Sequence, residues 1–579
     1  AFDRADFVHS ETFRTSAVAQ VALEPHACLA EVSDGIWRVR TSTQSPFGVR
    51  EDAASILGVP EQSLVVEASW VGGGFGGKAA AFLEPYALVL AAAARRPVKL
   101  ALTYREEFLL GRSTLPSIIR LDSAVKEGRL TGRRVRLLLD TGASLPGRDF
   151  ATGYAIGFLL GPYRAAAFEV EGYAVRTNKP PFGPHRAPFA PQCAFALESH
   201  LDGIARRLGV DPIAFRRAHV WKKGDSTHYG QPVGPFGLDA CLESAQRLAA
   251  EWRLQLPANH GIGVGCGFWS TGTGAGGEAE LMLSEEKLLV IEGEREIGSG
   301  SVIRGLVAVA EKVLGIPPER VELEYRSTAK GPFDSGVFGS RTVGALGQAV
   351  QKAAEGLQTE LARRAGTKEL PKLTVVGGKL ALQFGRKSRP LGELLTPAER
   401  RSGGLTARGK HYGASGTIDE HRVVDGTFYP YSDYAAACHL AEVEVDRETG
   451  RLRVIRYATF HDVGTVIDAA TLQAQVEGGV AMGLGEALTE EAMWSSEAML
   501  ENPSLLDYRI PAMGEVPPVQ FTPITGFPGA GPFGAKGMGE PPIIPVPAAV
   551  GNAMADATGA RLTELPFTPE RVARTLRLL

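Results

Sequence analysis

The sequence predicts an α+β protein made of two mixed domains. Strand-like and helix-like hydrophobic patterns alternate along the chain, and we find neither a short fixed repeat nor a low-complexity tract. A chain of 579 residues is too long for one hydrophobic core and is typical of two to four domains. Its 69 glycines and 37 prolines are more than helical bundles use, and they indicate many turns and close backbone approaches.

The first half of the chain alternates between strands and helices. Residues 63–71 (SLVVEASWV) combine β-branched side chains with alternation, which favours a strand. Residues 78–94 have helical spacing and stop at Arg95-Arg96-Pro97, because the residue before a proline avoids helical geometry. The same patterns predict a turn and strand at 129–140, and helices at 194–208 and 239–254.

The pattern starts again after residues 256–260 (LPANH), which have the composition of a linker. We therefore expect domains of residues 1–258 and 259–579. Alternation at 278–292 indicates a hairpin, and a polar turn at 446–450 separates strands at 439–445 and 451–460. The remaining expected elements are helices at 302–314 and 472–482, a strand at 320–325, and a long Pro/Gly-rich loop at 517–537 of a kind that is often functional.

Composition excludes several classes of function. A net charge of −3 gives no basic field for nucleic acid and no polybasic patch for a membrane. The longest apolar run, residues 88–94, is too short to span a bilayer. Five widely spaced cysteines without a Cys-x-x-Cys pair argue against an iron–sulfur cluster or zinc ribbon, and favour reduced thiols in the cytoplasm. Because the sequence starts at Ala1 without an initiator Met or signal peptide, we expect a fragment or a processed subunit.

The segment from Gly534 to Pro542 (GAKGMGEPP) surrounds one acidic side chain, Glu540, with glycines and two prolines. Glycines permit close backbone approach, and the prolines restrict the backbone and remove two donors. A carboxylate held with few waters acquires a raised pKa and can serve as a general base. The alternative is a solvent-exposed glutamate in a loop before a helix.

A second glycine-rich segment, residues 72–78 (GGGFGGK), lies between a predicted strand and helix. It fits the Gly-x4-Gly-Lys pattern of a phosphate-binding P-loop, and residues 135–140 (VRLLLD) imitate a Walker B strand, so an NTPase is a competing hypothesis. Two features weaken it. Ala79 stands where the Mg²⁺-binding Ser or Thr belongs, and Phe75 places a bulky ring inside the loop.

Further short motifs surround these two in a fixed order along the chain. They are Thr43-Gln44-Ser45; GGGFGGK at 72–78; Thr177-Asn178 with Arg186 and Pro191-Gln192; EIGSG at 296–300; GSRT at 339–342 with GQAV at 347–350; DVG at 462–464; QVEG at 475–478; and GMGEPP at 537–542. The set resembles the molybdenum-binding large subunit of the molybdenum hydroxylases, the xanthine dehydrogenase and aldehyde oxidase family, over nearly the whole chain.

The resemblance implies two elongated α/β domains with a molybdenum cofactor at their interface. The metal would be held by the dithiolene of molybdopterin, free or in its cytosine dinucleotide form, and by no protein ligand. Glu540 would be the catalytic base. The residues that would contact the cofactor are Gln44, Gly74, Phe75, Gly76, Arg186, Gly298, Ser299, Gly300, Gly339, Ser340, Arg341, Thr342, Gln475, Lys536 and Gly537.

The implied reaction inserts oxygen from water into an aldehyde or a nitrogen heteroaromatic. Because this chain has no cluster-forming cysteines and no dinucleotide motif, the electrons would leave to partner subunits that carry [2Fe–2S] clusters and FAD. The family's hammerhead-like N-terminal domain precedes the matched region, so we expect it on a separate polypeptide or removed. A homodimer of hetero-oligomers is implied, whereas nucleic-acid and membrane partners are not expected.

Several positions depart from the family pattern. Ala79 replaces a glutamate of the xanthine-oxidising members, and their substrate-binding arginine and phenylalanine fall at Tyr154 and Pro188. Losing such anchors costs orders of magnitude in specificity, so we expect xanthine to be a poor substrate. The cysteine that copper-containing carbon monoxide dehydrogenases carry after the arginine is absent from 186–189. Ser299 replaces a glutamine, and a non-catalytic homologue or assembly partner remains an alternative.

Overall fold

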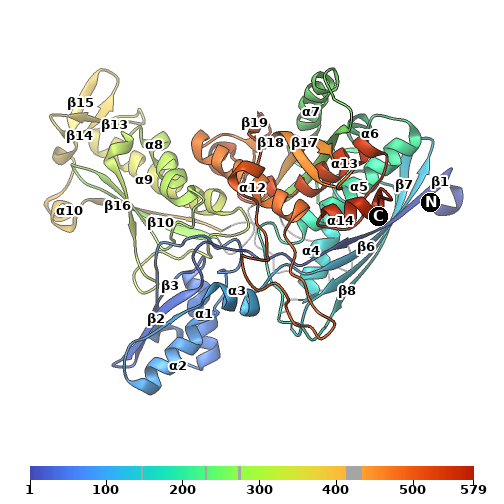
Figure 1. Cartoon of the computed structure of the whole chain (residues 1–579). Coiled ribbons are helices and arrows are strands. Elements are labelled where there is room, and N and C mark those ends of the chain that lie inside the picture. The colour runs from blue at the N-terminus through green and yellow to red at the C-terminus, as the bar shows by residue number, and fades with distance from the viewer. Residues whose placement is uncertain (145–147, 229–230, 272–275, 413–432, 579) are drawn as a thin grey trace.

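The structure is a computed structural model that describes residues 1–144, 148–228, 231–271, 276–412 and 433–578. Helices and mixed sheets build three lobes, each around its own large hydrophobic core (Figure 1). We call them the small lobe (core residues between 28 and 91), the middle lobe (between 279 and 405) and the large lobe, whose core runs from residue 13 to residue 572. The predicted α+β class is confirmed.

The small lobe is one sheet covered by two helices. Its strand order is β4-β3-β2-β5, with β3 and β4 parallel and the other pairs antiparallel. Apolar side chains of helices α1 and α2 pack on this sheet and share its core. The elements are β2 (Ala27–Ser33), β3 (Ile36–Thr41), α1 (Pro46–Leu57), β4 (Leu64–Ala68), α2 (Glu84–Ala94) and β5 (Val98–Ala101), followed by α3 (Tyr104–Leu110).

The middle lobe packs helices α8 and α9 on a sheet of order β12-β11-β10-β16 and carries a second, three-stranded sheet. Two π-helical turns, Ser301–Leu306 and Thr342–Leu346, lead into these helices. The elements are β10 (Gly277–Leu283), β11 (Leu288–Glu292), α8 (Val307–Leu314), β12 (Val321–Tyr325), α9 (Gly347–Ala365), β13 (Lys372–Val376), β14 (Lys379–Phe384), β15 (Lys387–Pro390), α10 (Pro397–Ser402) and β16 (Leu405–His411).

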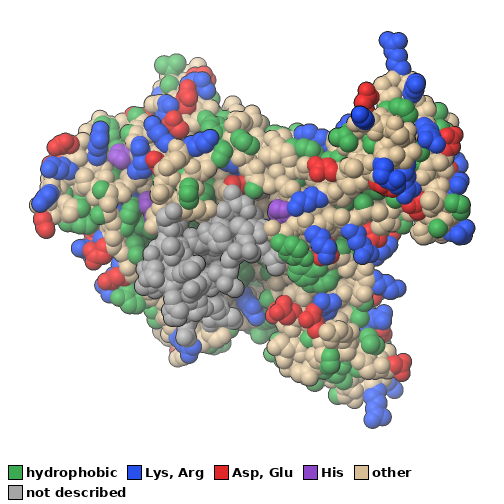
Figure 2. Space-filling model, turned by 180° about the vertical axis from the view of Figure 1, so that it is seen from behind, with side chains coloured by type: hydrophobic (Ala, Val, Ile, Leu, Met, Phe, Trp, Pro, Cys, Tyr) green, Lys and Arg blue, Asp and Glu red, His purple; other side chains and the backbone are tan. Residues whose placement is uncertain are grey.

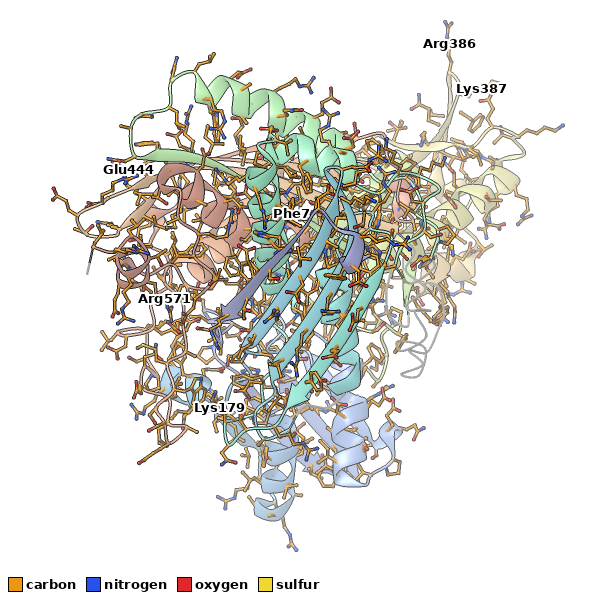
Figure 3. All side chains as sticks on the ribbon, turned by 90° about the vertical axis from the view of Figure 1, so that its right-hand side faces the viewer. Phe7, Lys179, Arg386, Lys387, Glu444 and Arg571 are labelled. Atoms are coloured by element: carbon orange, nitrogen blue, oxygen red, sulfur yellow. The ribbon has the colours of Figure 1, made fainter. Side chains whose placement is uncertain are left out.

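The large lobe joins two four-stranded sheets, β1-β6-β7-β8 and β19-β18-β17-β9, through a layer of helices. Figure 3 looks onto the first sheet, with Phe7 and Lys179 near its opposite ends. The elements are β1 (Phe7–Thr15), β6 (Ser117–Lys126), β7 (Arg129–Asp140), α4 (Arg148–Leu160), β8 (Phe168–Val175), α5 (Ala190–Leu208), α6 (Pro212–His219), α7 (Leu238–Arg253), β9 (His260–Thr271), β17 (Asp433–Val445), β18 (Leu452–Gly464), α12 (Ala469–Leu488), β19 (Val519–Thr525), α13 (Val546–Thr558) and α14 (Pro569–Thr575).

The expected domain boundary at residue 258 falls between α7 and β9. The core of the large lobe crosses it, because β9 and α13 from the second half pack on α5 from the first. The boundary itself stays a prediction.

Most predicted elements are confirmed, including both hairpins and the helices that became α5, α7 and α12. The helix expected from residue 78 begins only at Glu84, because residues 72–83 form the glycine loop and turns. The loop expected at 517–537 contains strand β19, so that prediction is wrong for residues 519–525. The sequence did not predict this strand because it contains Pro523, which is unfavourable inside a sheet. A proline is tolerated here because β19 lies at the edge of its sheet.

A row of alternate glycines lets helix α13 lie directly on strand β9. A Cβ atom added to Gly261, Gly263 or Gly265 would lie 2.1 to 2.5 Å from backbone atoms of α13 or of Pro545 just before it. Real Cβ atoms do not approach backbone so closely, so only glycine allows this contact. Helix α13 follows Glu540 by a few residues, and the strand therefore sets where the catalytic candidate lies.

The surface carries mixed charge. On the face shown in Figure 2, Lys and Arg side chains are interspersed with Asp and Glu, and no large field of one sign dominates. Among the described residues, no helix is both long enough and apolar enough to cross a membrane.

We expect Gly263→Ala to lower the free energy of unfolding by about 1–3 kcal/mol, because overpacking must push α13 off the strand. Gly356→Ala is the matched control. It lies in helix α9 with no atom within 4 Å of an added Cβ, and alanine there stabilises by about 0.5–1 kcal/mol. Chemical denaturation of both variants tests this, and equal stability of Gly263→Ala and the parent chain would contradict the close contact.

Candidate functional site

Glu540 is a buried carboxylate at the junction of the large and middle lobes. Its side chain accepts a hydrogen bond from Ser340 Oγ at 2.7 Å, and its backbone N–H donates to the same oxygen at 2.9 Å. Burial raises the pKa of Glu540 to about 7, against the opposing effects of the Ser340 hydrogen bond and the Arg186 charge. The expectation of a water-poor carboxylate is met, since Glu540 is 9% exposed.

Arg186 connects the Glu540 loop to helix α12. Its Nε donates to the Gly539 carbonyl at 2.6 Å, and one terminal nitrogen donates to the Gln475 carbonyl at 3.0 Å and to Gln475 Oε1 at 3.4 Å. Burial lowers the pKa of Arg186 to about 10, which leaves it cationic at neutral pH, and Glu540 opposes the shift. The structure therefore places Arg186, Gln475 and Glu540 around one point.

Gln44 fixes the glycine loop of the small lobe against the middle lobe. Its side-chain oxygen accepts from the N–H groups of Gly76 at 3.0 Å and Lys78 at 3.3 Å, while its amide nitrogen donates to the Val337 carbonyl at 2.9 Å. Gly74 lies against this amide, and a Cβ there would be 2.3 Å from Gln44 Oε1. This close contact explains why residue 74 is a glycine.

The same loop also contacts the segment before Arg186. A Cβ on Gly76 would lie 2.7 Å from the Pro184 carbonyl oxygen, so glycine is required for this approach. Phe75, between Gly74 and Gly76, is half-buried and adopts a positive φ of 51°. The loop thus reaches the large lobe two residues from Arg186.

The structure argues against the P-loop hypothesis for residues 72–78. Lys78 is 2% exposed, and its ammonium donates to the Glu24 carbonyl at 2.8 Å and to the Glu24 carboxylate at 3.1 Å. A P-loop lysine instead faces the bound phosphates from the start of a helix, whereas here helix α2 begins only at Glu84. Lys78 is an internal tether between the loop and residue 24.

Residues 296–300 form a turn organised by a carboxylate. Glu296 accepts from the backbone N–H groups of Gly298 and Gly300 at 2.9 Å each, and from Ser299 Oγ at 3.0 Å. These donors therefore face Glu296 in this structure. A Cβ on Gly300 would lie 2.6 Å from the Thr471 side chain, which brings this turn to the start of α12, whereas one on Gly298 would meet nothing within 4 Å.

Two predicted cofactor-binding cations form internal ion pairs. Arg341 is fully buried and donates to Asp334 at 2.7 Å and to the Gly336 carbonyl at 2.6 Å. Lys536 donates to Asp462 at 2.6 Å and to the carbonyls of Pro235 and Tyr434. Their charges hold the chain rather than face an open site.

The neighbours of these cations meet each other beside Glu540. A Cβ on Gly537 would lie 2.1 Å from the Ser340 carbonyl oxygen, so the two segments are in backbone contact. Gly339 and Ser340 both adopt positive φ, and Thr342 is buried at the start of the second π-helical turn. Gly339 also accepts a hydrogen bond from Trp269 Nε1 at 3.4 Å.

Two of the three predicted substrate positions, Tyr154 and Pro188, lie in and beside an aromatic wall. The Tyr154 ring packs edge-on against Phe158, Phe189 and Trp269 with centroids 4.9, 6.4 and 5.7 Å away. Pro188 lies between Ala187 and Phe189, which both have positive φ. Ala79 lies apart in sequence, at the end of the glycine loop. The sequence did not single out the three other rings, because lone aromatics in apolar strands and helices carry no motif.

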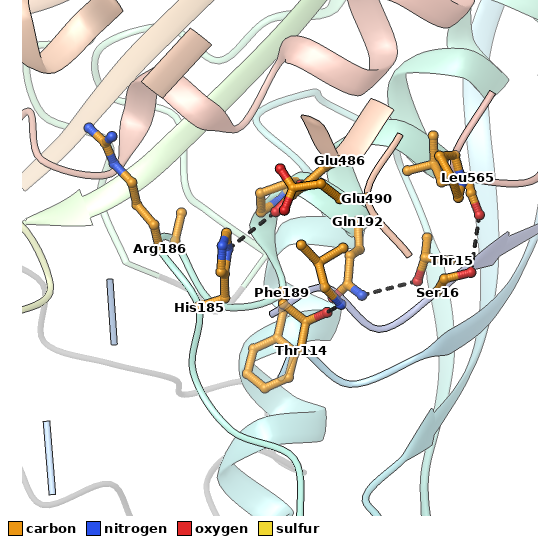
Figure 4. A pocket seen from close by; sticks show the side chains of 14 residues that line it. Thr15, Ser16, Thr114, His185, Arg186, Phe189, Gln192, Glu486, Glu490 and Leu565 are labelled. Atoms are coloured by element: carbon orange, nitrogen blue, oxygen red, sulfur yellow. Dashed lines mark hydrogen bonds and ion pairs between the residues drawn. The ribbon is translucent and has the colours of Figure 1, made fainter. Parts of the chain in front are cut away.

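A small cavity lies on the other side of the Arg186 loop (Figure 4). His185 turns into it and pairs with Glu486 at 3.2 Å, while Arg186 extends away. Burial raises the pKa of Glu490 to about 8, and Tyr508 donates a hydrogen bond to it at 2.9 Å. Gln192 also lines this cavity and donates to Thr15 at 3.0 Å. No sequence motif pointed to this acidic pair.

Sequence comparisons place both halves of the chain in one group of proteins. Residues 1–220 and 240–517 each match a molybdopterin cofactor-binding domain. The xanthine dehydrogenase molybdenum-binding subunit of Escherichia coli O157:H7 is 30% identical over 601 residues, covering 100% of this chain and 78% of that protein. The nicotine 6-hydroxylase large subunit of Paenarthrobacter nicotinovorans is 30% identical over 619 residues, covering 100% and 74%.

Solved structures share the fold. The aldehyde oxidoreductase from Desulfovibrio gigas superposes with a TM-score of 0.88 at 26% identity, and this chain spans 62% of its length. Quinoline 2-oxidoreductase from Pseudomonas putida 86 gives a TM-score of 0.86 at 25% identity, with 100% of this chain and 77% of that chain covered.

We expect Ser340→Ala to raise the pKa of Glu540 above its value of about 7, because the burial cost stays while a hydrogen bond to the carboxylate is lost. An infrared pH titration measures this through the carboxyl band that disappears in Glu540→Gln. Ser299→Ala, which removes a hydroxyl from the Glu296 carboxylate instead, is the control and should leave that band in place. An unchanged or lower pKa in Ser340→Ala would refute the assignment.

Proposed function

Because this chain belongs to the molybdopterin cofactor-binding family of molybdenum hydroxylase large subunits, we propose that it catalyses molybdenum-dependent oxidation of an aldehyde or nitrogen heteroaromatic, with Glu540 as the general base. The observation that carries this proposal is a carboxylate of raised pKa, buried where the large and middle lobes meet. Water supplies the inserted oxygen.

The residues around Glu540 fit a cofactor that brings its own metal ligands. All five cysteines are buried free thiols, and burial raises the pKa of Cys193, Cys241 and Cys266, so these three thiols are poorly suited to bind a metal as thiolates. Gly298 presents a bare backbone, and a Cβ on Gly478 would meet only Arg186, at 3.9 Å. Gln44, Phe75 and Arg186 would hold the cofactor from the small and large lobes.

Other proposed cofactor contacts come from backbone near the same point. Gly298 would approach the pterin from the middle lobe through its open backbone, and Gln475 would approach it from α12. Ser299 and Gly300 would act by holding this turn through their hydrogen bonds to Glu296. Gly339 to Thr342 would contribute through their backbone, since the Arg341 side chain is held by Asp334. Lys536 and Gly537 would act by holding the Glu540 loop in place. These contacts agree with a molybdopterin, in either its simple or its cytosine dinucleotide form.

When bound, the molybdenum cofactor accepts two electrons from substrate and acidifies water at the site. The protein residues then perform proton transfer and positioning. Glu540 takes a proton from the attacking water, and a pKa near 7 suits a base that must be ionised yet able to accept that proton at neutral pH. Ser340 fixes one carboxylate oxygen, and the Arg186 charge favours the ionised form.

The aromatic wall formed by Tyr154, Phe158, Phe189 and Trp269 would receive a flat or apolar substrate. Ala79 and Pro188 offer it no charged anchor. Electrons would leave to iron–sulfur and FAD subunits, and the "subunit" names of the relatives support this assembly. A separate hammerhead-like segment, a homodimer of such complexes and a cytoplasmic location complete the proposal. A non-catalytic homologue or assembly partner is the second candidate, and the departures at Ser299 and Pro188 favour it.

We expect kcat/KM for the best aldehyde or apolar heteroaromatic to exceed that for xanthine by orders of magnitude, because a pocket without polar partners cannot repay the desolvation of xanthine. Steady-state kinetics of the assembled complex with both substrate classes measure this ratio. Comparable values would show that Ala79, Tyr154 and Pro188 do not line the substrate pocket. Ala79→Glu is the companion variant and should shift the ratio towards xanthine.

We expect Glu540→Gln to keep the molybdenum content and lose at least about 100-fold in kcat, since general base catalysis is worth about 10²–10⁴-fold.

In the parent enzyme kcat/KM should rise with pH through about 7 as Glu540 ionises. The contribution of Glu540 to the free energy of unfolding should show the opposite trend. Because the pKa of Glu540 is higher in the folded state than the unfolded value of 4.5, this contribution is fully present below pH 4.5 and is lost as the pH rises through about 7.

Normal turnover of Glu540→Gln with intact metal would move the base elsewhere. Loss of metal together with rate would make Glu540 a structural residue. A parent enzyme that holds molybdenum but oxidises neither substrate class would favour the assembly role.

A further inference from the structure

Three side chains with metal-ligating atoms converge in the large lobe, outside the site described above. His9 and Glu11 are two residues apart on β1 and therefore project from the same face of the strand. His200 projects from α5, which packs across that sheet. One ligating atom from each lies within 4.8 Å of the others, and this is the one such group among the described residues.

The imidazole rings of His9 and His200 both contact the same carboxylate oxygen of Glu11. His200 Nδ1 lies 3.0 Å from Glu11 Oε2, and His9 Nε2 lies 3.2 Å from it. Ligand atoms around a tetrahedral Zn²⁺, with bonds of about 2.0–2.1 Å, are separated by roughly 3.3 Å. The spacing around Glu11 therefore already suits a bound ion.

Nε2 of His9 is buried, and its approach to Glu11 Oε2 at 3.2 Å does not have the geometry of a hydrogen bond. Buried polar atoms without a well-formed hydrogen bond are rare and often indicate an unseen water or ion. The ring is accommodated by Gly203, one turn after His200 on α5, where an added Cβ would lie 2.8 Å from His9 Nε2.

His200 is oriented as metal-binding histidines are. Its other nitrogen, Nε2, lies 3.0 Å from Ser123 Oγ on β6, a contact that fixes the ring. The group thus holds two imidazole rings and one carboxylate, with one ligand atom of each within 4.8 Å of the others.

Arg561 is the cation that approaches the group, and it is engaged elsewhere. Its Nε lies 3.7 Å from Glu11 Oε1, the oxygen that faces away from the histidines. Its terminal nitrogens donate to Asp202, and to Asn552 Oδ1 at 2.7 Å. Asp202 accepts from both Arg561 and Arg206, and Arg561 approaches Glu11 at Oε1, whereas Oε2 faces His9 and His200.

We propose that His9 Nε2, Glu11 Oε2 and His200 Nδ1 bind a divalent transition-metal ion, Zn²⁺ by preference, that joins strand β1 to helix α5. Two imidazoles and a carboxylate are a ligand set typical of Zn²⁺, with a water in the fourth position. The ion would be separate from the redox cofactor, since it would need only β1 and α5.

The position gives this ion a structural role. Thr15, four residues along β1 from Glu11, and Gln192, eight residues along α5 from His200, hydrogen-bond to each other in the cavity behind Arg186. These separations correspond to about 13 Å of strand and about 12 Å of helix. Fixing β1 to α5 at one end would steady the helix whose other end follows the Arg186 loop.

The test is metal binding by the full chain, purified with its partners, stripped with a chelator and dialysed against Zn²⁺ or Co²⁺. We expect about one equivalent per chain beyond molybdenum, the visible absorption of tetrahedral Co²⁺, and a higher Tm with Zn²⁺. His9→Ala and Glu11→Gln should abolish binding and the Tm response. Ser123→Ala should weaken binding about 10–100-fold.

His260→Ala is the matched control, because it removes a half-buried histidine paired with a glutamate, Glu442, at 2.7 Å. This control should bind Zn²⁺ as the parent does. If His9→Ala or Glu11→Gln fails to fold, Gly203→Ala replaces it, since the added methyl group would lie 2.8 Å from His9 Nε2 and displace that ring. Absence of Zn²⁺ and Co²⁺ binding by the parent, or full binding by His9→Ala, would overturn the proposal.

Discussion

The whole arrangement depends on backbone contact between lobes, and glycine makes that contact. The glycine loop of the small lobe packs against Gln44 at Gly74 and against Pro184, two residues before Arg186, at Gly76, where a Cβ would lie 2.3 and 2.7 Å from these neighbours. The middle and large lobes meet at Gly537, whose Cβ would lie 2.1 Å from the Ser340 carbonyl oxygen. Glycine backbone contacts, together with the Gln44 and Arg186 side chains, therefore hold the three lobes against one another.

Burying that carboxylate has an electrostatic cost, which the surroundings offset in part. One hydroxyl and one guanidinium favour its ionised form, while burial opposes it, and the result is a pKa of about 7. Lys536 and Arg341 do not add to this balance, because Asp462 and Asp334 neutralise them locally. The internal ion pairs of Lys536 and Arg341 thus hold the junction between the lobes together, and Arg186 is the cation whose charge acts on Glu540.

Sequence reasoning singled out Glu540 and the glycines around it because they lie within one short segment, and the structure shows that this carboxylate is buried. It could not assign Ser340 to Glu540, since the two are 200 residues apart and meet only through the tertiary fold. Motif order suggested that Arg341 and Lys536 contact the cofactor, but a motif does not reveal that Asp334 and Asp462 bind their charges. Strand β19 was missed because its proline is permitted only by an edge position that the sequence does not display.

The glycine row of β9 has a consequence for how this protein can change. Helix α13 packs directly on the backbone of β9, so the distance between the helix and the strand depends on the lack of side chains at these glycines. Mutation can only add atoms there, and each addition would lift the segment that carries Glu540. Sequence changes should therefore accumulate away from this strand, whereas residues 261, 263 and 265 should stay glycine because they set the distance between β9 and the segment that follows Glu540.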